Sequence, residues 1–367
     1  MVEWKKLGEV CEIGTGSNNR EDACEGGLYP FYVRSQEVLR INSFLFDEEA
    51  ILIPGEGGVG DIFHYINGKY GLHQRTYRVH PISNSAIGKY IYYYLFANFK
   101  LYINQKSYKS TAASIRKPML TDFPICFPSL SDQQRIVEQL DTFTASIDNL
   151  KEQIAQRRKQ YEYYRDELLD LEGKEEKDIH CWGEFCEMEK GNGVQKVDFV
   201  DEGVGCIHYG QIYTHYGPYT YETNKFVSKE VFEKARKASK GDIIMTDTSE
   251  NVEDICKSVA YLGEDDIAVS NHALIIKHQQ NPIFLSFSTQ TNNFLVQKRK
   301  YVVGAKVSGI KPDNLAQIKI YLPSLSEQQR IVSILDTFEG SIQNLEAQLE
   351  QRQKQYEYYR NKLLTFE

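Results

Sequence analysis

Long apolar runs are missing from this chain of 367 residues. A helix that crosses a bilayer needs roughly 20 consecutive apolar residues, and no segment of the sequence approaches that length. The first ten residues, MVEWKKLGEV, also lack the apolar stretch of a secretion signal. The sequence therefore predicts a cytoplasmic protein that does not associate with a membrane.

Cysteine is sparse, and no pair of cysteines has the spacing of a metal site. The chain lacks a CxxC pair and any cluster of cysteine and histidine that resembles a zinc site. The seven cysteines are therefore expected to be reduced thiols, and no metal ligand is assigned. They are Cys11, Cys24, Cys126, Cys181, Cys186, Cys206 and Cys256.

Motifs for catalysis are missing as well. The glycine-rich segment 54–60 is not followed by the Gly-Lys-Ser/Thr of a phosphate-binding loop, so a turn is the expected structure there. Residues 281–284, Asn-Pro-Ile-Phe, lack the second proline of the Asn-Pro-Pro-Tyr loop of amino methyltransferases. We assign no catalytic residue and expect no cofactor on this chain.

No segment carries a strong positive charge. The formal net charge of the chain is −8, divided as +1 in residues 1–127, −4 in 128–172, −3 in 173–322 and −2 in 323–367. A protein that holds DNA mainly by charge has a strongly basic body. Any contact with DNA must therefore come from local patches.

An internal repeat organises the sequence. The 42 residues that begin at Pro128 match the 42 that begin at Pro323 at 29 positions, with an offset of 195 residues. Each copy predicts a helix of about 40 residues, on the order of 60 Å long. Ser131 and Ser326 are the predicted N-caps, with Gln134 and Gln329 completing capping boxes.

Apolar residues in both copies alternate at spacings of four and three, which is typical of a coiled-coil seam. The two helices are therefore expected to pair with each other about a pseudo-twofold axis. An antiparallel pair is favoured, although the sequence leaves a parallel pair open. The predicted pairing residues are Ile136, Leu140, Phe143, Ile147, Leu150, Ile154, Ile331, Leu335, Phe338, Ile342, Leu345 and Leu349.

Two arginines, Arg157 and Arg352, fall on this seam. A charged residue there is costly unless its head reaches water or a carboxylate. Two roles stay open for them: fixing the register of the helix pair, which is favoured, or contacting a partner protein.

The segments that precede the helices, residues 1–127 and 173–322, have the mixed character of α+β domains. Strands are predicted at 50–53 and 242–245, and helices at 87–104 and 228–239. Trp4 and the following Glu-Val-Cys-Glu resemble Trp182 and the following Glu-Phe-Cys-Glu, while most of the intervening sequence differs. Two related scaffolds with dissimilar bodies suggest one task performed on two different targets.

Candidate DNA contacts combine basic patches with polar loops. For any one of these residues, an ordinary turn, core or solvent-exposed role is the alternative. The patches before the helices contain Lys106, Tyr108, Lys109 and Arg116 in the first domain, and Lys298, Arg299, Lys300 and Lys306 in the second. The loop candidates are Tyr32, Arg34, Gln36, Gln74 and Arg75, and then His208, Tyr209 and Gln211.

The doubled layout resembles the specificity subunits of type I restriction-modification systems. Leu120, Pro128, Gln133-Gln134, Ile136 and Leu140, together with their copies Leu315, Pro323, Gln328-Gln329, Ile331 and Leu335, carry the resemblance. It covers essentially the whole chain. It implies two target-recognition domains, 1–127 and 173–322, joined by two antiparallel conserved helices, 128–172 and 323–367.

The resemblance also implies a function without chemistry on this chain. Such a subunit reads a split, asymmetric site in double-stranded DNA, with the helices setting the spacing of its halves. Two modification subunits, which bind S-adenosylmethionine and methylate adenine, dock on it, and restriction subunits that use ATP and Mg²⁺ add to that core. Two alternatives from other classes are a coiled-coil scaffold that links two protein-binding modules and a fused methyltransferase-nuclease; the missing motifs disfavour the second.

Overall fold

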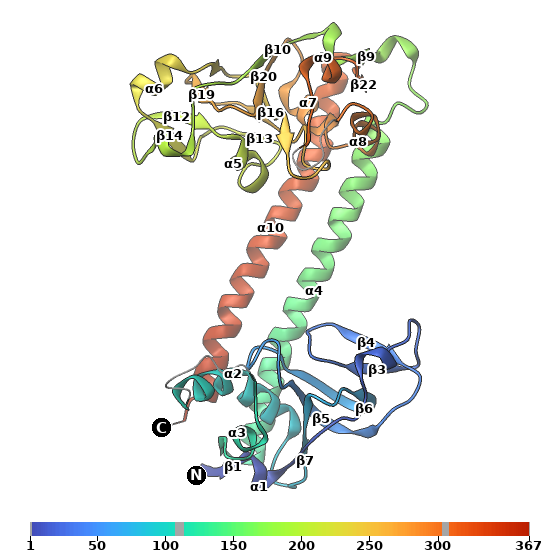
Figure 1. The fold of residues 1–367 in the computed structure, drawn as a ribbon, viewed down its shortest axis with the longest axis vertical. Coiled ribbons are helices and arrows are strands. Elements are labelled where there is room, and N and C mark those ends of the chain that lie inside the picture. Colours follow the sequence, from blue (N-terminus) through green and yellow to red (C-terminus); the bar gives the residue numbers. More distant parts are fainter. Residues whose placement is uncertain (1, 107–113, 303–307, 367) are drawn as a thin grey trace. The chain divides into compact units, whose positions relative to one another are not determined.

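The computed structural model describes residues 2–106, 114–302 and 308–366. The chain forms two compact units (Figure 1). The first unit comprises Met1–Glu152 and Glu346–Glu367, and the second comprises Gln153–Leu345. Each unit thus combines a globular domain with a segment of both long helices. Within the described residues, no helix is long and apolar enough to span a membrane.

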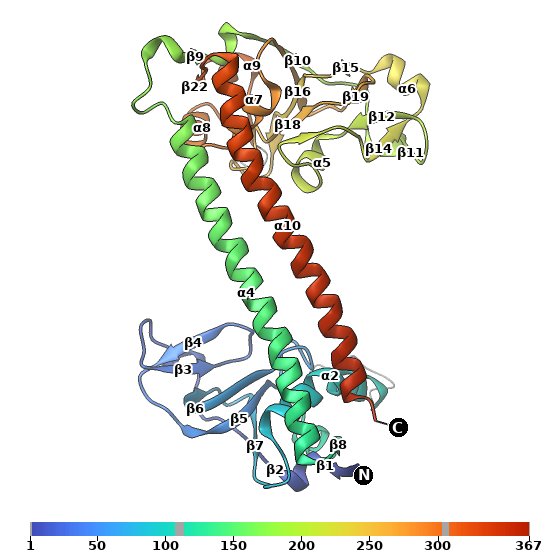
Figure 2. The ribbon, with the colours of Figure 1, turned by 180° about the vertical axis from the view of Figure 1, so that it is seen from behind.

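The repeated segments form two 40-residue helices, α4 (Leu130–Leu169) and α10 (Leu325–Leu364). In the first unit, Phe143 of α4 stacks on Tyr359 near the end of α10, with ring centroids 5.3 Å apart. In the second unit, Phe338 of α10 makes the equivalent contact with Tyr164 near the end of α4, at 5.4 Å. The helices therefore pair antiparallel, and the two contacts are related by the repeat (Figure 2).

The arginines on the seam lie over the same aromatic rings. The guanidinium of Arg352 is 5.8 Å from the ring centroid of Phe143, and that of Arg157 is 5.9 Å from the ring centroid of Phe338. Each charge thus interacts with a ring face of the opposite helix. This contact favours the role in helix register over the role in partner binding.

The helix starts differ from the prediction. Each helix begins one residue after Ser129 or Ser324, and these serines accept the N–H groups of Asp132 at 3.2 Å and Glu327 at 3.4 Å. Ser131 is therefore not the N-cap, and neither is Ser326. The predicted starts were two residues too late. The third residue after each true N-cap is an acidic residue, Asp132 or Glu327, whereas the prediction expected a glutamine at that position.

Buried glutamines connect each helix start to its own domain. The side chain of Gln133 accepts the N–H of Ile87 and donates to the carbonyl of Pro128, at 3.0 Å each. Gln328 repeats this arrangement with Asn281 and Pro323, at 3.0 and 2.8 Å. Gln133 and Gln328 thus each attach the start of a long helix to its own globular domain.

The first domain is built on a six-stranded sheet in the order β2-β7-β5-β6-β3-β4. Its strands are β2 (Cys11–Thr15), β3 (Tyr29–Tyr32), β4 (Val38–Ile41), β5 (Phe46–Pro54), β6 (His64–Leu72) and β7 (Thr76–Pro81). Alternation along β5 places Ile51 and Ile53 in the core beneath α2 (Gly88–Lys106), while Ala50 and Leu52 face a smaller core on the other side. The predicted strand at 50–53 and the predicted helix at 87–104 are confirmed.

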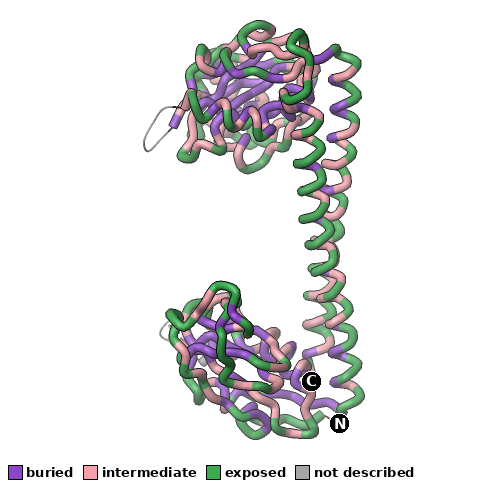
Figure 3. The backbone as a smooth tube through the Cα atoms, turned by 90° about the vertical axis from the view of Figure 1, so that its right-hand side faces the viewer, coloured by how far each residue is buried: buried purple, intermediate pink, exposed green. Residues whose placement is uncertain are grey.

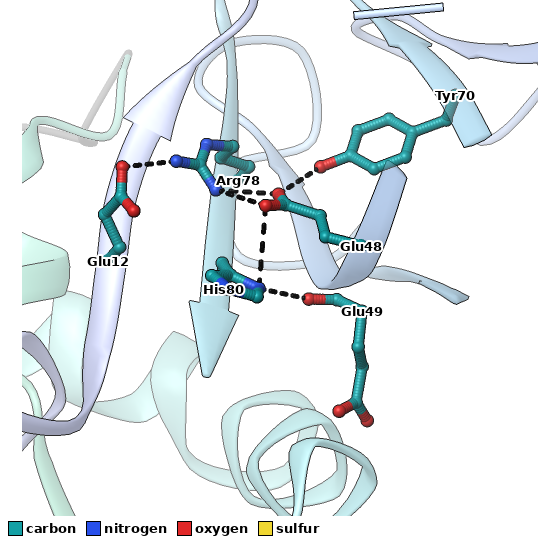
Figure 4. Close-up of polar contacts among 6 residues, drawn as sticks. All are labelled: Glu12, Glu48, Glu49, Tyr70, Arg78 and His80. Atoms are coloured by element: carbon teal, nitrogen blue, oxygen red, sulfur yellow. Dashed lines mark hydrogen bonds and ion pairs between the residues drawn. The ribbon is translucent and has the colours of Figure 1, made fainter. Parts of the chain in front are cut away.

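A polar network crosses this sheet at the end opposite to the carboxyl end of β5 (Figure 4). Arg78 donates through Nη1 to both carboxylate oxygens of Glu48, at 2.7 and 2.9 Å, and through Nη2 to Glu12. The hydroxyl of Tyr70 donates to Glu48 at 2.8 Å. Only 9% of the Arg78 side chain is exposed, so its charge depends on these carboxylates.

Short elements join the domain to its helix. They are β1 (Glu3–Lys6), which pairs antiparallel with β8 (Pro124–Phe127), and the helices α1 (Leu7–Val10) and α3 (Lys117–Thr121). The 3₁₀ turn η1 (Arg20–Asp22) lies between β2 and β3. The end of α10 completes the core, because Leu364 is buried there with Ile136 and Leu140 of α4. The first turns of the long helices are therefore core elements as well as coiled-coil elements.

The second domain contains two five-stranded sheets, ordered β10-β20-β16-β18-β13 and β11-β14-β12-β19-β15. The first sheet comprises β10 (Cys186–Lys190), β13 (Tyr219–Thr220), β16 (Ile243–Thr246), β18 (Ser258–Tyr261) and β20 (Ala273–His278). The second comprises β11 (Phe199–Val200), β12 (Val204–Ile207), β14 (Lys225–Val227), β15 (Lys237–Ala238) and β19 (Ile267–Val269). In each unit, burial is concentrated in the sheets and their covering helices (Figure 3).

The remaining elements of this domain are short. They are β9 (Ile179–Cys181) paired with β22 (Lys319–Tyr321), β17 (Thr248–Ser249) paired with β21 (Ser308–Gly309), the helices α5 (Tyr209–Thr214), α6 (Lys229–Lys234), α7 (Pro282–Ser288), α8 (Asn292–Arg299) and α9 (Pro312–Leu315), and the 3₁₀ turns η2 (Glu176–Asp178), η3 (Trp182–Glu184) and η4 (Lys196–Asp198). The helix predicted at 228–239 ends early, because Ala238 is buried in β15 and pairs with β19.

The tryptophans are not equivalent, contrary to the predicted resemblance. The backbone N–H of Trp182 donates to the carbonyl of Ile318 at 3.0 Å, and the backbone N–H of Leu7 makes the same bond to Phe123 in the first domain, at 2.9 Å. Trp182 is fully buried, whereas Trp4 lies three residues earlier, on β1, and is 54% exposed. The correct match aligns Leu7-Gly8-Glu9 with Trp182-Gly183-Glu184.

Candidate nucleic-acid interface

Four loops of the first domain converge at the carboxyl end of β5. They are residues 16–22, 33–36, 55–63 and 73–75. The N–H of His73 donates to the carbonyl of Tyr32 at 3.0 Å, and the N–H of Gly55 donates to that of Arg75 at 2.9 Å. An isolated bridge joins Asn18 to His73. Strand ends that meet in this way bring the two predicted contact runs, at 32–36 and 73–75, to one place.

Exposed polar side chains gather on these loops around Glu56. Arg34 donates through Nη1 to the carboxylate at 3.0 Å, and Arg75 donates through Nη1 to both of its oxygens, at 3.1 and 2.9 Å. Hydrogen bonds from the two guanidinium groups, with Arg75 the larger contributor, hold the pKa of Glu56 below its usual range. Gln74 is exposed beside them and bonds Asn19 at 2.6 Å.

The second domain repeats this loop framework. The N–H of Ser270 donates to the carbonyl of Ile207 at 3.1 Å, and the N–H of Asp247 donates to that of His272 at 3.2 Å. These bonds match those of His73 and Gly55 in the first domain. The match places Tyr209 at the position of Arg34, His272 at that of Arg75 and Thr248 at that of Glu56.

The side chains on the repeated framework are different. Tyr209 packs edge-on against His272, with ring centroids 5.3 Å apart, and its N–H donates to the hydroxyl of Ser270 at 2.9 Å. His272 has a φ of 66°, which is uncommon for a residue other than glycine. The buried carboxylate of Asp247 lies 2.8 Å from Lys190 Nζ. An aromatic and histidine surface thus replaces the guanidinium and carboxylate surface of the first domain.

Some predicted loop contacts point into the protein. Tyr32 is 7% exposed, and its ring lies against His64 and Tyr70, so it belongs to the core of the first domain. His208 is 5% exposed and caps α5 by accepting the N–H of Gly210 at 3.1 Å. Burial lowers the pKa of this histidine. The prediction that Tyr32 and His208 offer surface groups is therefore wrong.

The other loop candidates stay near the surface. Gln36 is exposed, and Gln211 bonds Asn224 and accepts the N–H of His208 at 2.8 Å. These residues occupy corresponding positions in the two frameworks.

The segment of the first domain that carries Arg116 lies against the loop at 55–63. In the first domain, Lys100 of α2 forms an ion pair with Asp61, and the N–H of Ile115 donates to the carbonyl of Gly55 at 2.7 Å. Arg116 is exposed at the N-cap of α3, and Lys106 ends α2. Tyr108, Lys109 and Lys306 lie outside the described residues. The backbone just before Arg116 and the side chain of Lys100 thus contact the loop at 55–63.

Lys298 differs from its predicted role. It is 2% exposed, and its ammonium group donates to the carbonyls of Glu253 and Ile255 at 2.7 and 2.5 Å. Burial lowers the pKa of Lys298. The prediction of a surface cation was wrong because α8 packs this side chain into the core beneath the loop after β16. Its neighbours Arg299, paired with Glu253 at 3.1 Å, and Lys300 remain exposed.

Sequence reasoning missed Glu56, Asp247 and Lys190. Glu56 lies in the glycine-rich segment that was interpreted only as a turn, and the three glycines at 57, 58 and 60 adopt positive φ values. A lone carboxylate between glycines gives no signal of two arginines, because those residues come from other loops. Among the described residues, no cluster of His, Cys, Asp and Glu could hold a metal ion.

Comparison with known proteins relates the chain to DNA specificity proteins. A family model described as the type I restriction modification DNA specificity domain matches residues 1–157 and 174–352. The EcoR124I/EcoR124II type I restriction enzyme specificity subunit of Escherichia coli is 29% identical over 309 residues, which cover 77% of this chain and 72% of that protein.

Two further similarities agree with this match. The EcoDI specificity subunit of E. coli is 36% identical over 157 residues, covering 42% of this chain and 34% of that protein. The crystal structure of the S subunit of a type I restriction-modification system from M. genitalium has the same fold, with a TM-score of 0.63 at 15% identity, covering 100% of this chain and 97% of that one. Because the family model covers most of the chain, this protein belongs to the family of type I restriction-modification DNA specificity subunits.

Proposed function

We propose that this subunit reads a bipartite, asymmetric site in double-stranded DNA, with one half assigned to each globular domain. The observation that carries the proposal is the loop framework, in which two backbone hydrogen bonds of the first domain recur in the second while the side chains differ. A shared framework with different donors and acceptors is suited to reading two different base sequences, because base edges in the major groove are distinguished by their hydrogen-bonding groups.

The methylation and cleavage reactions belong to partner subunits in this proposal. Two modification subunits would dock on the chain and methylate adenine, and restriction subunits would complete the assembly. The antiparallel helix pair supplies two related surfaces, since α4 and α10 share most of their sequence. S-adenosylmethionine, ATP and Mg²⁺ would be bound by those partners.

A domain exchange tests the assignment of half-sites. Residues 1–127 are replaced by the corresponding segment of a relative with a different target, and the hybrid is expressed with its modification subunits. Long-read sequencing of methylated adenines should show one altered half-site and one unchanged half-site, because the second domain keeps its own loops. The matched control exchanges 173–322 and should alter only the other half.

The donor for the first exchange must preserve the contacts of the domain with α10, since Tyr356 and Leu363 pack on its core. If methylated sites still contain the unchanged half-site of the second domain, the hybrid has assembled with its modification subunits. A hybrid that changed both half-sites, or that methylated the original motif, would contradict the proposal.

A further inference from the structure

We propose that the half-site of the first domain contains a G·C base pair, and that Arg34, Glu56 and Arg75 read it as one unit. We call these three residues the reading triad. The inference rests on the proposed function and extends it, because it assigns a base composition to one half-site and a specificity role to Glu56.

The geometry leaves the right groups available. The hydrogen bonds to Glu56 use only Nη1 of each arginine. Within the described part of the chain, Nη2 and Nε of both guanidinium groups make no hydrogen bond and can still donate to a ligand. The side chains are 43% exposed for Arg34 and 58% exposed for Arg75. A guanidinium group that keeps two N–H directions can donate to O6 and N7 of guanine, the commonest specific contact in the major groove.

The central carboxylate favours bases over phosphates as the ligand. Glu56 is 36% exposed and would repel a phosphate brought against either arginine. The same carboxylate can accept the N4 amino group of cytosine. An arginine beside a carboxylate therefore offers complementary groups to both members of a G·C pair, whereas a phosphate would be matched better by the arginines alone.

The backbone fixes the triad in place. A Cβ atom at Gly55 would lie 2.9 Å from the carbonyl oxygen of Arg75, and one at Gly57 would lie 3.3 Å from that of Arg34. Gly57 also has a φ of +72°, which other residues rarely adopt. The loop thus passes close to both arginine backbones, so Glu56 reaches both guanidinium groups at once.

The second domain shows why this prediction concerns one half-site only. Its corresponding positions carry Tyr209, Thr248 and His272, which provide no guanidinium and no carboxylate. The same backbone framework there presents the rings of Tyr209 and His272. The two halves of the target should therefore differ in base composition at the positions that these residues face.

The first part of the test uses the assembled complex of the chain with its modification subunits. The methylated motif is determined, and domain exchange identifies the half-site of the first domain. Binding is then measured to the motif duplex, to a scrambled duplex, and to duplexes in which each guanine of that half-site is replaced by 7-deazaguanine, which lacks N7. We expect at least one replacement to weaken binding by roughly 5- to 150-fold.

Variants in the second part distinguish reading from structure. Arg34→Lys and Arg75→Lys should reduce the preference for the motif over its G·C-to-A·T variant by a similar factor, because lysine lacks the rigid planar fork of N–H donors that a guanidinium group presents. Glu56→Gln should reduce the same preference while leaving or raising affinity for the scrambled duplex, since it removes a negative charge. A merely structural defect would weaken binding to both duplexes.

An ion pair of similar exposure provides the matched control. Glu327 and Arg330 on α10 lie 2.7 Å apart and are 33% and 56% exposed, so Glu327→Gln should leave the preference unchanged. The inference would be overturned if the half-site of the first domain contained no G·C pair, or if the arginine variants kept the full preference for the motif over its G·C-to-A·T variant. The proposal of a bipartite site would stand in either case. A complex that binds motif and scrambled duplexes equally would instead refute the proposed function.

Discussion

Replacing Arg78 with methionine is expected to lower the free energy of unfolding of the first unit by about 3 kcal/mol, the low end of the range for breaking a buried ion pair. The loss arises because the Glu48 carboxylate, whose side chain is 16% exposed, would lose both hydrogen bonds from Nη1 of Arg78. The hydroxyl of Tyr70 remains as a donor and limits the effect. This is the network drawn in Figure 4.

Hydrogen exchange followed by mass spectrometry separates the two units in this experiment. Amides of β5 and β7 should lose protection, whereas those of β16 and β20 serve as the internal reference. The double variant Arg78→Met with Glu48→Leu should recover most of the loss, because an apolar pair of similar volume avoids the unpaired charge. A single variant within 1 kcal/mol of the parent protein would show that the network contributes little.

The second large effect is expected from a pair of leucines related by the repeat. Leu140→Ala and Leu335→Ala should each cost about 2–5 kcal/mol, because both side chains are fully buried and alanine leaves a cavity. Leu140 lies in the core of the first domain and Leu335 in that of the second. Each substitution should therefore reduce amide protection mainly in its own unit.

The matched control is Ser333→Ala, on the exposed face of the same turn of α10, which removes only a bond to the carbonyl of Gln329. Its effect should stay within about 0.5 kcal/mol. Unchanged protection after both leucine substitutions would mean that the helix starts are not part of the domain cores.

The long helices were the most predictable part of the fold. Their heptad pattern can be read from one segment of the chain, so periodicity predicted both the helices and their pairing. The capping serines were misplaced by two residues, since Ser129 and Ser131 are equally good candidates in sequence. The helix predicted at 228–239 was partly wrong because strand pairing by Ala238 is a tertiary effect.

The interface was less predictable than the fold. The runs around Arg34 and Arg75 were identified from residue type, but Glu56 became visible only when three loops met. The burial of Lys298 could not be read from its basic neighbours, because the packing of α8 decides which lysine faces inward. Equivalence between the two frameworks rests on backbone hydrogen bonds, which divergent side chains conceal.

The burial of Leu364 in the core of the first domain has a consequence for synthesis on the ribosome. The core that begins near Leu7 is completed by residues at the other end of the chain. At a translation rate of about 5–20 residues per second, the last turn of α10 follows residue 152 by roughly 10–40 s. The first domain to leave the ribosome is therefore the one that must wait for its final piece, and until then an apolar face of α4 and α2 stays uncovered for chaperones to bind.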